Sequence, residues 1–135
     1  MVTQTVVDVP DGLYHYDVRS HELVERRAGN LQRAMAAIAL GQEMVLGANA
    51  IVVITALLDR TMQKYKQRGY RYALMEAGHL AQNICLVAAG LGLGSVPIGG
   101  FFDRELGELL ALDQSEELAI YAVCTGHGEF ASPSL

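Results

Sequence analysis

The strongest constraint on the fold is a long segment without proline, from about Tyr70 to Leu91. Apolar residues recur along it at the spacing of a helical face. These positions are Ala73, Ala77, Leu80, Ala81, Ile84, Val87, Ala88 and Leu91. Small residues lie on more than one face of this helix, and a helix that is apolar nearly all round must be covered on every side. We therefore expect one long and well-buried helix.

The size and charge of the chain narrow the class of protein. At 135 residues it fits one domain, and a chain of this length can bury roughly two thirds of its unfolded surface. A net charge of -5 without any block of Lys or Arg argues against a nucleic-acid partner, which needs a basic stripe. No apolar run approaches the length of a bilayer span, and the N-terminus does not resemble a signal peptide. We expect a soluble, cytoplasmic protein without a membrane partner.

Strand and helix signals alternate along the rest of the chain, which indicates an α+β fold. The β-branched run Ala50–Leu58 is typical of a central strand covered on both faces. Asn30 is a good N-cap for a helix that runs to Leu40, with Gly41 as its stop. Its buried stripe is expected to be Leu31, Ala34, Met35, Ile38 and Ala39. The other expected elements are a hairpin of Gly12–Val18 with His21–Arg26, a strand Ser95–Gly99, a helix capped by Asp103 that runs to Leu110, and a last strand Glu117–Thr125.

Two patterns resemble known motifs but lack the required context. The glycines of Gly90–Gly94 close a helix and lead into a strand, whereas a dinucleotide-binding loop follows a strand and opens a helix. Glu76 and His79 have the Glu-x-x-His spacing of di-iron bundles, but such sites need two copies and further carboxylates. We expect no metal site. Cys85 and Cys124 lie far apart in apolar surroundings, so two buried, reduced thiols are expected.

The segment Lys64–Tyr72 concentrates four cations and three tyrosines around one glycine. Cations at a helix N-terminus oppose the helix dipole, so Arg68 and Arg71 cost stability unless an anion or a carboxylate lies nearby. This composition indicates a functional or interfacial surface. The alternative is a solvated first helical turn with tyrosines stacked along its side.

A second candidate is the segment Pro97–Phe101, in which two glycines follow a short apolar strand. Glycines remove Cβ atoms and allow a flat ligand to lie against backbone N–H groups. The alternative is an ordinary turn between a strand and the helix at Asp103.

Together with three further segments, these motifs resemble the nitroreductase superfamily, and in particular its azoline-oxidase (SagB/McbC-like) branch. The resemblance implies an α+β fold in which a mixed sheet is flanked by helices with a long central helix. It also implies FMN bound at the interface of a two-fold dimer, and an FMN-dependent oxidoreductase that transfers hydride between flavin and a small-molecule or peptide-derived substrate. The segments that carry it are Gly12–Asp17 with His21–Leu23, Ile51–Thr55, Lys64–Tyr72, Glu76–Asn83 and Leu91–Phe101.

The resemblance also implies roles for particular residues. In the family, backbone groups of the Pro-Ile-Gly-Gly turn face the reactive edge of the flavin, where an N–H near N5 tunes hydride transfer. In this chain the turn is Pro97, Ile98, Gly99 and Gly100.

In azoline oxidases a Lys-Tyr pair, matched here by Lys64 and Tyr65, assists the removal of a proton. This chemistry is reasonable because a partly desolvated lysine loses affinity for its proton and can act as a base, with a phenol as relay. Arg68 and Arg71 are implied to hold a carboxylate or phosphate.

The N-terminal part departs from the family pattern. The family normally begins with an Arg-x-Ser-x-Arg segment that grips the FMN phosphate, and nothing before Gly12 matches it. The tail from Gly126 to Leu135 lacks the basic residues that many relatives place there. We expect a single nitroreductase-like domain over residues 1–135, shortened at its N-terminus. Either another chain completes it, as a homodimer or a different partner, or it is a non-catalytic subunit with weak or no FMN binding.

Overall fold

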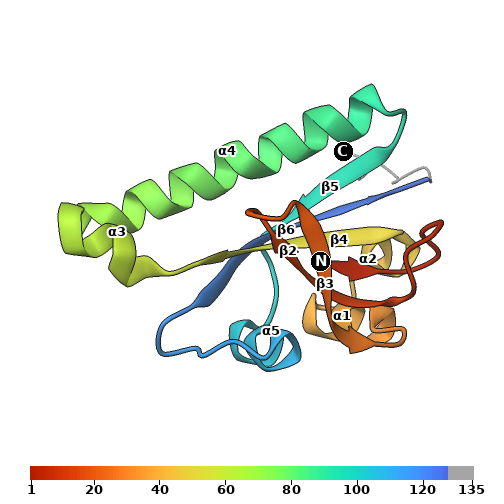
Figure 1. Ribbon diagram of the computed structural model, residues 1–135, viewed down its shortest axis with the longest axis horizontal. Helices are drawn as coiled ribbons and strands as arrows, with labels where there is room; N and C mark the ends of the chain where they lie inside the picture. The colour runs from red at the N-terminus through yellow and green to blue at the C-terminus, as the bar shows by residue number, and fades with distance from the viewer. Residues whose placement is uncertain (128–135) are drawn as a thin grey trace.

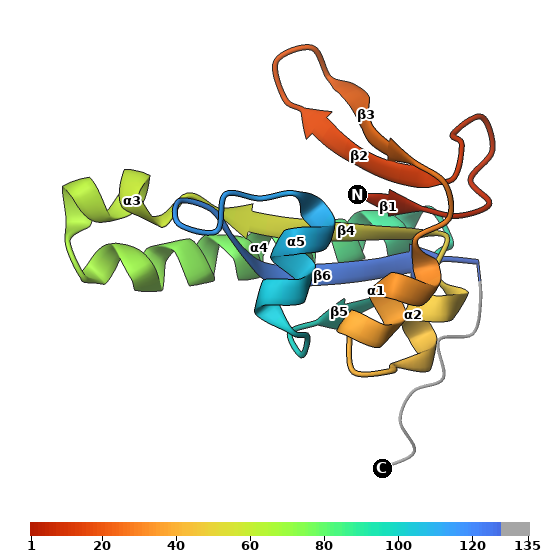
Figure 2. The same ribbon diagram turned by 90° about the horizontal axis from the view of Figure 1, so that it is seen from below.

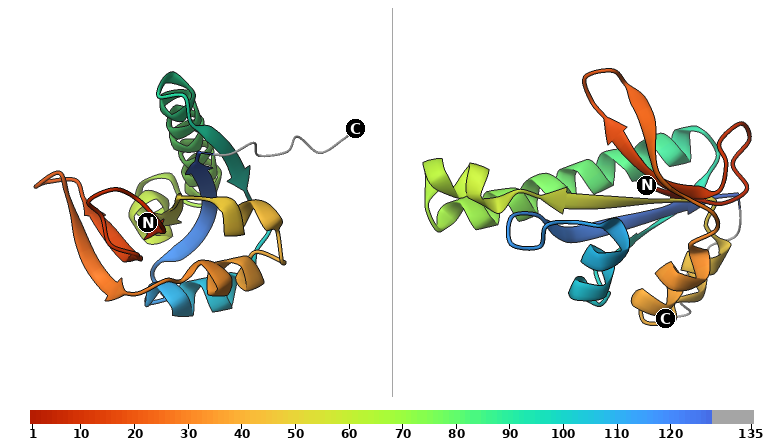
Figure 3. Two further views of the ribbon diagram at one scale, coloured as in Figure 1. Left: turned by 90° about the vertical axis from the view of Figure 1, so that its right-hand side faces the viewer. Right: turned by 60° about the horizontal axis from the view of Figure 1, so that its bottom comes forward.

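A six-stranded sheet separates one long helix from a group of three short helices (Figure 1). The computed structural model describes residues 1–127. The strand order is β3-β2-β1-β4-β6-β5, and Figure 3 shows the layers end-on. The α+β class is confirmed. Every pairing between the described strands is antiparallel, where we expected a mixed sheet.

The bounds of the elements agree with most of the sequence predictions. The strands are β1 Val2–Thr3, β2 Gly12–Asp17, β3 Glu22–Ala28, β4 Ala50–Ala56, β5 Gly94–Ile98 and β6 Leu118–Gly126. The helices are α1 Gln32–Ile38, α2 Glu43–Gly47, α3 Leu58–Tyr65, α4 Arg68–Gly90 and α5 Asp103–Leu110. The sequence patterns did not predict β1, α2 or α3. The first two are too short to show a period, and the predicted strand Ala50–Leu58 ran into the first residue of α3.

Strand β4 is the centre of the molecule, as predicted. It lies between β1 and β6, and its β-branched side chains enter both layers. Ile51 packs among the residues under the short helices, whereas Ile54 packs against the alanines of α4. The strand ends at Ala56, so Leu58 begins α3 and does not continue β4 as expected.

Helix α1 begins one residue later than predicted, because Leu31 and not Asn30 takes the N-cap position. The Asn30 Oδ1 atom still accepts a hydrogen bond of 3.0 Å from the N–H of Gln32, the first residue of the helix. Gly41, with φ of 72°, follows the helix as expected. The predicted stripe was wrong at Ala34, which is exposed; Ala36 is buried in its place.

Helix α5 begins one residue earlier than its predicted cap implies. Asp103 is its first helical residue, Phe102 takes the N-cap position, and no side chain caps the helix. A carboxylate in the first turn still suits the positive end of the helix dipole.

The expectation that the long helix is well buried was wrong for the single chain. Helix α4 contacts the sheet through small residues, and its large apolar residues face away from the sheet. No second layer among the described residues covers them. The buried positions are Gly69, Ala73, Ala77, Ala81 and Ala88. Exposed residues of the helix include Leu74 (41%), Met75 (52%), Leu80 (49%), Leu86 (61%) and Val87 (62%), and Leu91 just after it is 69% exposed.

The predicted hairpin is confirmed as β2 and β3, and it projects from the sheet (Figure 2). All residues of β3 are exposed. Arg26 is an extra residue in its pairing with β2, because Leu13 pairs with Arg27 and Tyr14 with Glu25. At the other edge of the sheet, β5 carries Pro97. No helix in the described part is long and apolar enough to cross a membrane.

Candidate functional site

The turn that follows β5 presents Gly99 and Gly100 at the surface. It is anchored by Ile98, which is 4% exposed and pairs with Ala122. The side chain of Gln42 donates a hydrogen bond of 3.1 Å to the carbonyl of Gly100. Both glycines are exposed. The structure therefore fixes the ends of this turn and leaves its two glycines open.

Neither glycine is required by the protein itself. Gly99 and Gly100 do not adopt a positive φ. A Cβ on Gly99 would lie 3.6 Å from the ring of Tyr121, and one on Gly100 would lie 3.4 Å from Leu40, which are ordinary contacts. Within residues 1–127 their N–H groups donate to no acceptor. Open backbone with free donors fits the close approach of a flat ligand such as a flavin ring.

The predicted proton-transfer residues lie in contact at the end of α3. The Lys64 Nζ atom lies 5.1 Å from the ring centroid of Tyr65, which is the geometry of a cation–π contact. The Tyr65 ring meets that of Tyr72 edge-on, with centroids 5.0 Å apart. Lys64 and Tyr65 are both exposed. The desolvation that a base would need must therefore come from a ligand or a second chain.

Arg68 and Arg71 lie at the start of α4, as predicted, and neither finds a carboxylate in the described residues. Both ion pairs within residues 1–127 are formed by Arg104, which lies in α5. The first turn of α4 contains no acidic residue. Both side chains are exposed, so in the described part of the chain they face solvent.

Two groups of predicted site residues lie apart in one chain. Lys64, Tyr65, Arg68 and Arg71 lie at the junction of α3 and α4, at one end of the long axis. The Pro97–Gly100 turn lies at the end of the edge strand β5, nearer the middle of the long axis (Figures 1 and 2). A single chain does not bring them into one site.

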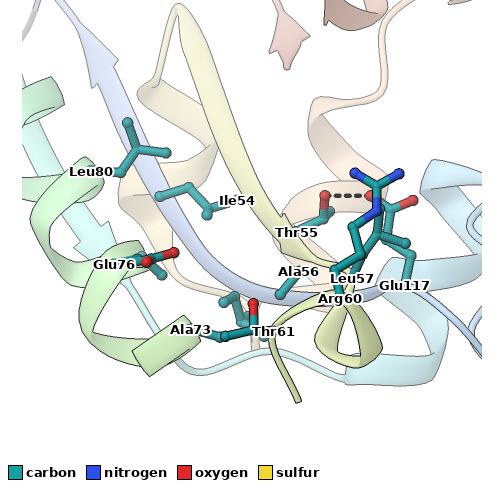
Figure 4. Close-up of a pocket in the computed structure, with 12 residues that line it drawn as sticks. Ile54, Thr55, Ala56, Leu57, Arg60, Thr61, Ala73, Glu76, Leu80 and Glu117 are labelled. Atoms are coloured by element: carbon teal, nitrogen blue, oxygen red, sulfur yellow. Dashed lines mark hydrogen bonds between the residues drawn. The ribbon is translucent and has the colours of Figure 1, made fainter. Parts of the chain in front are cut away.

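A hollow of about 350 Å³ lies between β4, α3 and α4 (Figure 4). Thr55 and Glu117 lie at its edge and share a hydrogen bond of 2.5 Å. A bulge in β6 adds Ile120 to the lining, because Ile54 pairs with Tyr121 and Thr55 with Ala119. Sequence reasoning missed this hollow, and its one signal is the polar Thr55 at the end of an apolar run. The lining residues are Ile54, Thr55, Ala56, Leu57, Arg60, Thr61, Ala73, Glu76, Ala77, Leu80, Glu117 and Ile120.

The possible metal ligands and the two cysteines do not form part of the Gly99–Gly100 turn. Among the described residues, no group of three or more His, Cys, Asp or Glu could hold a metal ion. Cys124 is buried, and burial raises the pKa of its thiol to about 12. Cys85 is only half-buried, so the expectation of two buried thiols was wrong for it. The expectation about the tail concerns mainly residues 128–135, which lie outside the described part.

Comparison with known proteins decides the family. The profile described as "Nitroreductase family" matches residues 4–127. The chain belongs to the nitroreductase family. Among family members, "Putative nitroreductase MJ1384" of Methanocaldococcus jannaschii is 38% identical over 109 residues, which are 81% of this chain and 55% of that protein. The microcin B17-processing protein McbC of Escherichia coli is 32% identical over 103 residues, 76% of this chain and 38% of McbC.

Solved structures show the same nitroreductase fold. A protein from Anabaena variabilis described as a nitroreductase superposes with a TM-score of 0.89 at 26% identity, over 98% of this chain and 28% of that one. The E. coli microcin synthetase McbBCD complex, with truncated pro-MccB17 bound, gives a TM-score of 0.76 at 30% identity, over 86% of this chain and 44% of that one. The chain is thus McbC-like and spans about half or less of the length of these proteins.

Proposed function

We propose that the chain is one nitroreductase-like domain of an FMN-dependent oxidoreductase that acts on a small-molecule or peptide-derived ring. The observation that carries this proposal is the Gly99–Gly100 turn. Its glycines are required neither by a positive φ nor by close packing, and their N–H groups have no acceptor among residues 1–127. A ligand that lies flat against the turn gives these features a reason.

The residues of the chain then have distinct tasks. FMN, when bound, supplies the ring that exchanges hydride with the substrate. The N–H groups of Gly99 and Gly100 would donate to the edge of that ring, and Pro97 and Ile98 would hold the turn in place. Lys64 and Tyr65 would move the proton that accompanies hydride transfer.

A second chain is part of the proposal, because the two groups of residues lie apart in one. Arg68 and Arg71 would then hold a carboxylate or phosphate group beside the junction of α3 and α4. The exposed apolar residues of α4 are the surface on which a homodimer or another completing chain would pack. The McbBCD relative works in a complex of several chains, which supports such an arrangement.

The alternative function is a non-catalytic or incomplete subunit that binds a partner and has weak or no FMN affinity. Two observations favour it. Lys64 is exposed in the single chain, and Arg68 and Arg71 at the start of α4 lie apart from the turn that follows β5. The experiment below separates the two functions.

The visible spectrum of the purified chain, before and after addition of FMN, tests the proposal. A ring held against the turn should shift and sharpen the flavin absorption bands and quench flavin fluorescence. Anaerobic addition of a reductant should then bleach the bound flavin. A spectrum equal to the sum of free FMN and protein, at concentrations where the chain self-associates, would support the non-catalytic subunit instead.

A further inference from the structure

The hollow between β4, α3 and α4 contains one carboxylate that nothing in the described chain balances. Glu76 enters it from α4 and, within residues 1–127, forms no hydrogen bond or ion pair. Arg60 and Glu117 line another side of the hollow, where Figure 4 labels both. With one cation and two carboxylates in its lining, the hollow carries a net negative charge.

The floor between the charged groups is apolar. Ile54, Ala73 and Ala77 are contributed by β4 and α4, and the bulge in β6 adds Ile120. Such a floor favours the apolar body of a ligand, since about 25 cal/mol is gained for each Å² removed from water. The hydroxyl of Thr61 at the rim can bond a polar group.

The position of the hollow makes it separate from the Gly99–Gly100 turn. The turn follows β5, whereas the hollow lies over β4, and β6 separates the two strands. The bulge at Ile120 re-aims the side chains of β6 beside the hollow, as bulges commonly do next to binding sites.

We propose that this hollow binds a small organic ammonium ion, with its apolar body on the floor and its cationic group at Glu76. This inference goes beyond the proposed function and does not rest on it. Glu76 is exposed, so the ion pair is screened by solvent and should strengthen binding only about 2–5-fold.

Three probes of nearly equal shape test the charge requirement on the flavin-free chain. They are isopentylamine, isopentanol and isovalerate, titrated while NMR shifts of Ile54, Ala73 and Ala77 are followed. The amine should bind about 2–5-fold more tightly than the alcohol, and the alcohol more tightly than the carboxylate. Methylamine should bind more weakly than isopentylamine, because it lacks the apolar body.

Glu76→Gln should reduce the affinity of the amine to that of the alcohol and leave the alcohol unchanged. Glu22→Gln, an equal change of charge on the distant and exposed β3, should leave all three affinities unchanged. Both positions are exposed, so neither variant should impair folding. The proposal is overturned if no probe shifts these resonances at millimolar concentration, if amine and alcohol bind equally, or if Glu76→Gln keeps the preference for the amine.

Discussion

A Cβ atom on Gly69 would lie 2.9 Å from the Cα of Met62 and equally close to the backbone of Thr61. Real Cβ atoms do not approach backbone this closely, so α3 and α4 touch at a point where no side chain fits. Gly69 is buried there, one residue after α4 begins. This contact fixes the position of Lys64 and Tyr65 relative to α4.

Gly69→Ala should force α3 away from α4 and lower the free energy of unfolding by about 1–3 kcal/mol. Gly78→Ala is the matched control, because a Cβ there meets nothing within 4 Å. That variant should be stabilised by about 0.5–1 kcal/mol, since alanine favours a helix interior over glycine. Urea unfolding at concentrations below self-association measures both. A stable Gly69→Ala would contradict the tight contact.

Gly99→Val should weaken flavin binding while leaving the fold intact. The added side chain meets only the Tyr121 ring at ordinary distance, but it occupies the surface where the flavin would lie. Gly107→Val should have the reverse effect, because Gly107 is buried in α5 and its Cβ would overlap the side chain of Gln114. Flavin retention and thermal unfolding report the two effects. Equal flavin retention in both variants counts against the turn as the site.

Val87→Glu should weaken self-association at least tenfold, because a charge buried at an interface costs several kcal/mol. Val87 is 62% exposed on α4. The control is the same substitution at Val18, which is 77% exposed on the turn of the hairpin, where no effect is expected. Sedimentation velocity across a range of concentrations measures the equilibrium. A chain that is only a monomer at micromolar concentration would refute the homodimer.

Lys64→Ala should leave fold and flavin content unchanged and slow flavin reduction by substrate about 10²–10⁴-fold, the usual contribution of a general base. Tyr65→Phe should cost less, because it keeps the edge-on contact with Tyr72 and removes only the hydroxyl. Lys66→Ala is the control, because its side chain bonds only the nearby carbonyl of Gln63. Anaerobic stopped-flow spectroscopy gives the rates. A wild-type rate in Lys64→Ala would remove Lys64 from the mechanism.

At about pH 8, iodoacetamide should modify Cys85 and spare Cys124, because alkylation requires an exposed thiolate. Mass spectrometry should count one label in native protein and two in denaturant.

Burial raises the pKa of Cys124 to about 12 from an ordinary 9.0. The unfolded chain therefore loses this proton at lower pH than the folded chain does. The free energy of unfolding should fall as the pH rises from about 9 towards 12, by up to about 1.4 kcal/mol per pH unit. Cys124→Ala should lack this part of the pH dependence.

The sequence predicted those parts of the fold in which local pattern and tertiary packing agree. The run from Ala50 became the central strand, and the helical period from Tyr70 became α4. The burial of α4 could not be read from its pattern, because Leu86 and Val87 are as apolar as core residues and only the packing shows which face meets the sheet. Periodicity gives the face of a helix but not the number of layers that cover it.

The position of the glycine turn was predictable from the sequence, whereas its distance from Lys64 was not. The Gly99–Gly100 turn falls where its glycines suggested. The separation of Lys64 from that turn depends on how far α4 runs, which no local signal encodes. The hollow at Glu76 requires Thr55 and Glu117, which are distant in sequence and meet only through the pairing of β4 with β6.

The two outer strands of the sheet differ from its centre in a way that bears on aggregation. Free strand edges template the growth of fibrils and the pairing of unrelated chains. On β5, Pro97 lacks the N–H that a new strand would need. On β3, the extra residue Arg26 bends the strand and adds a charge. Copies of this protein therefore cannot readily stack edge to edge, and even a concentrated solution should resist cross-β growth from the native state.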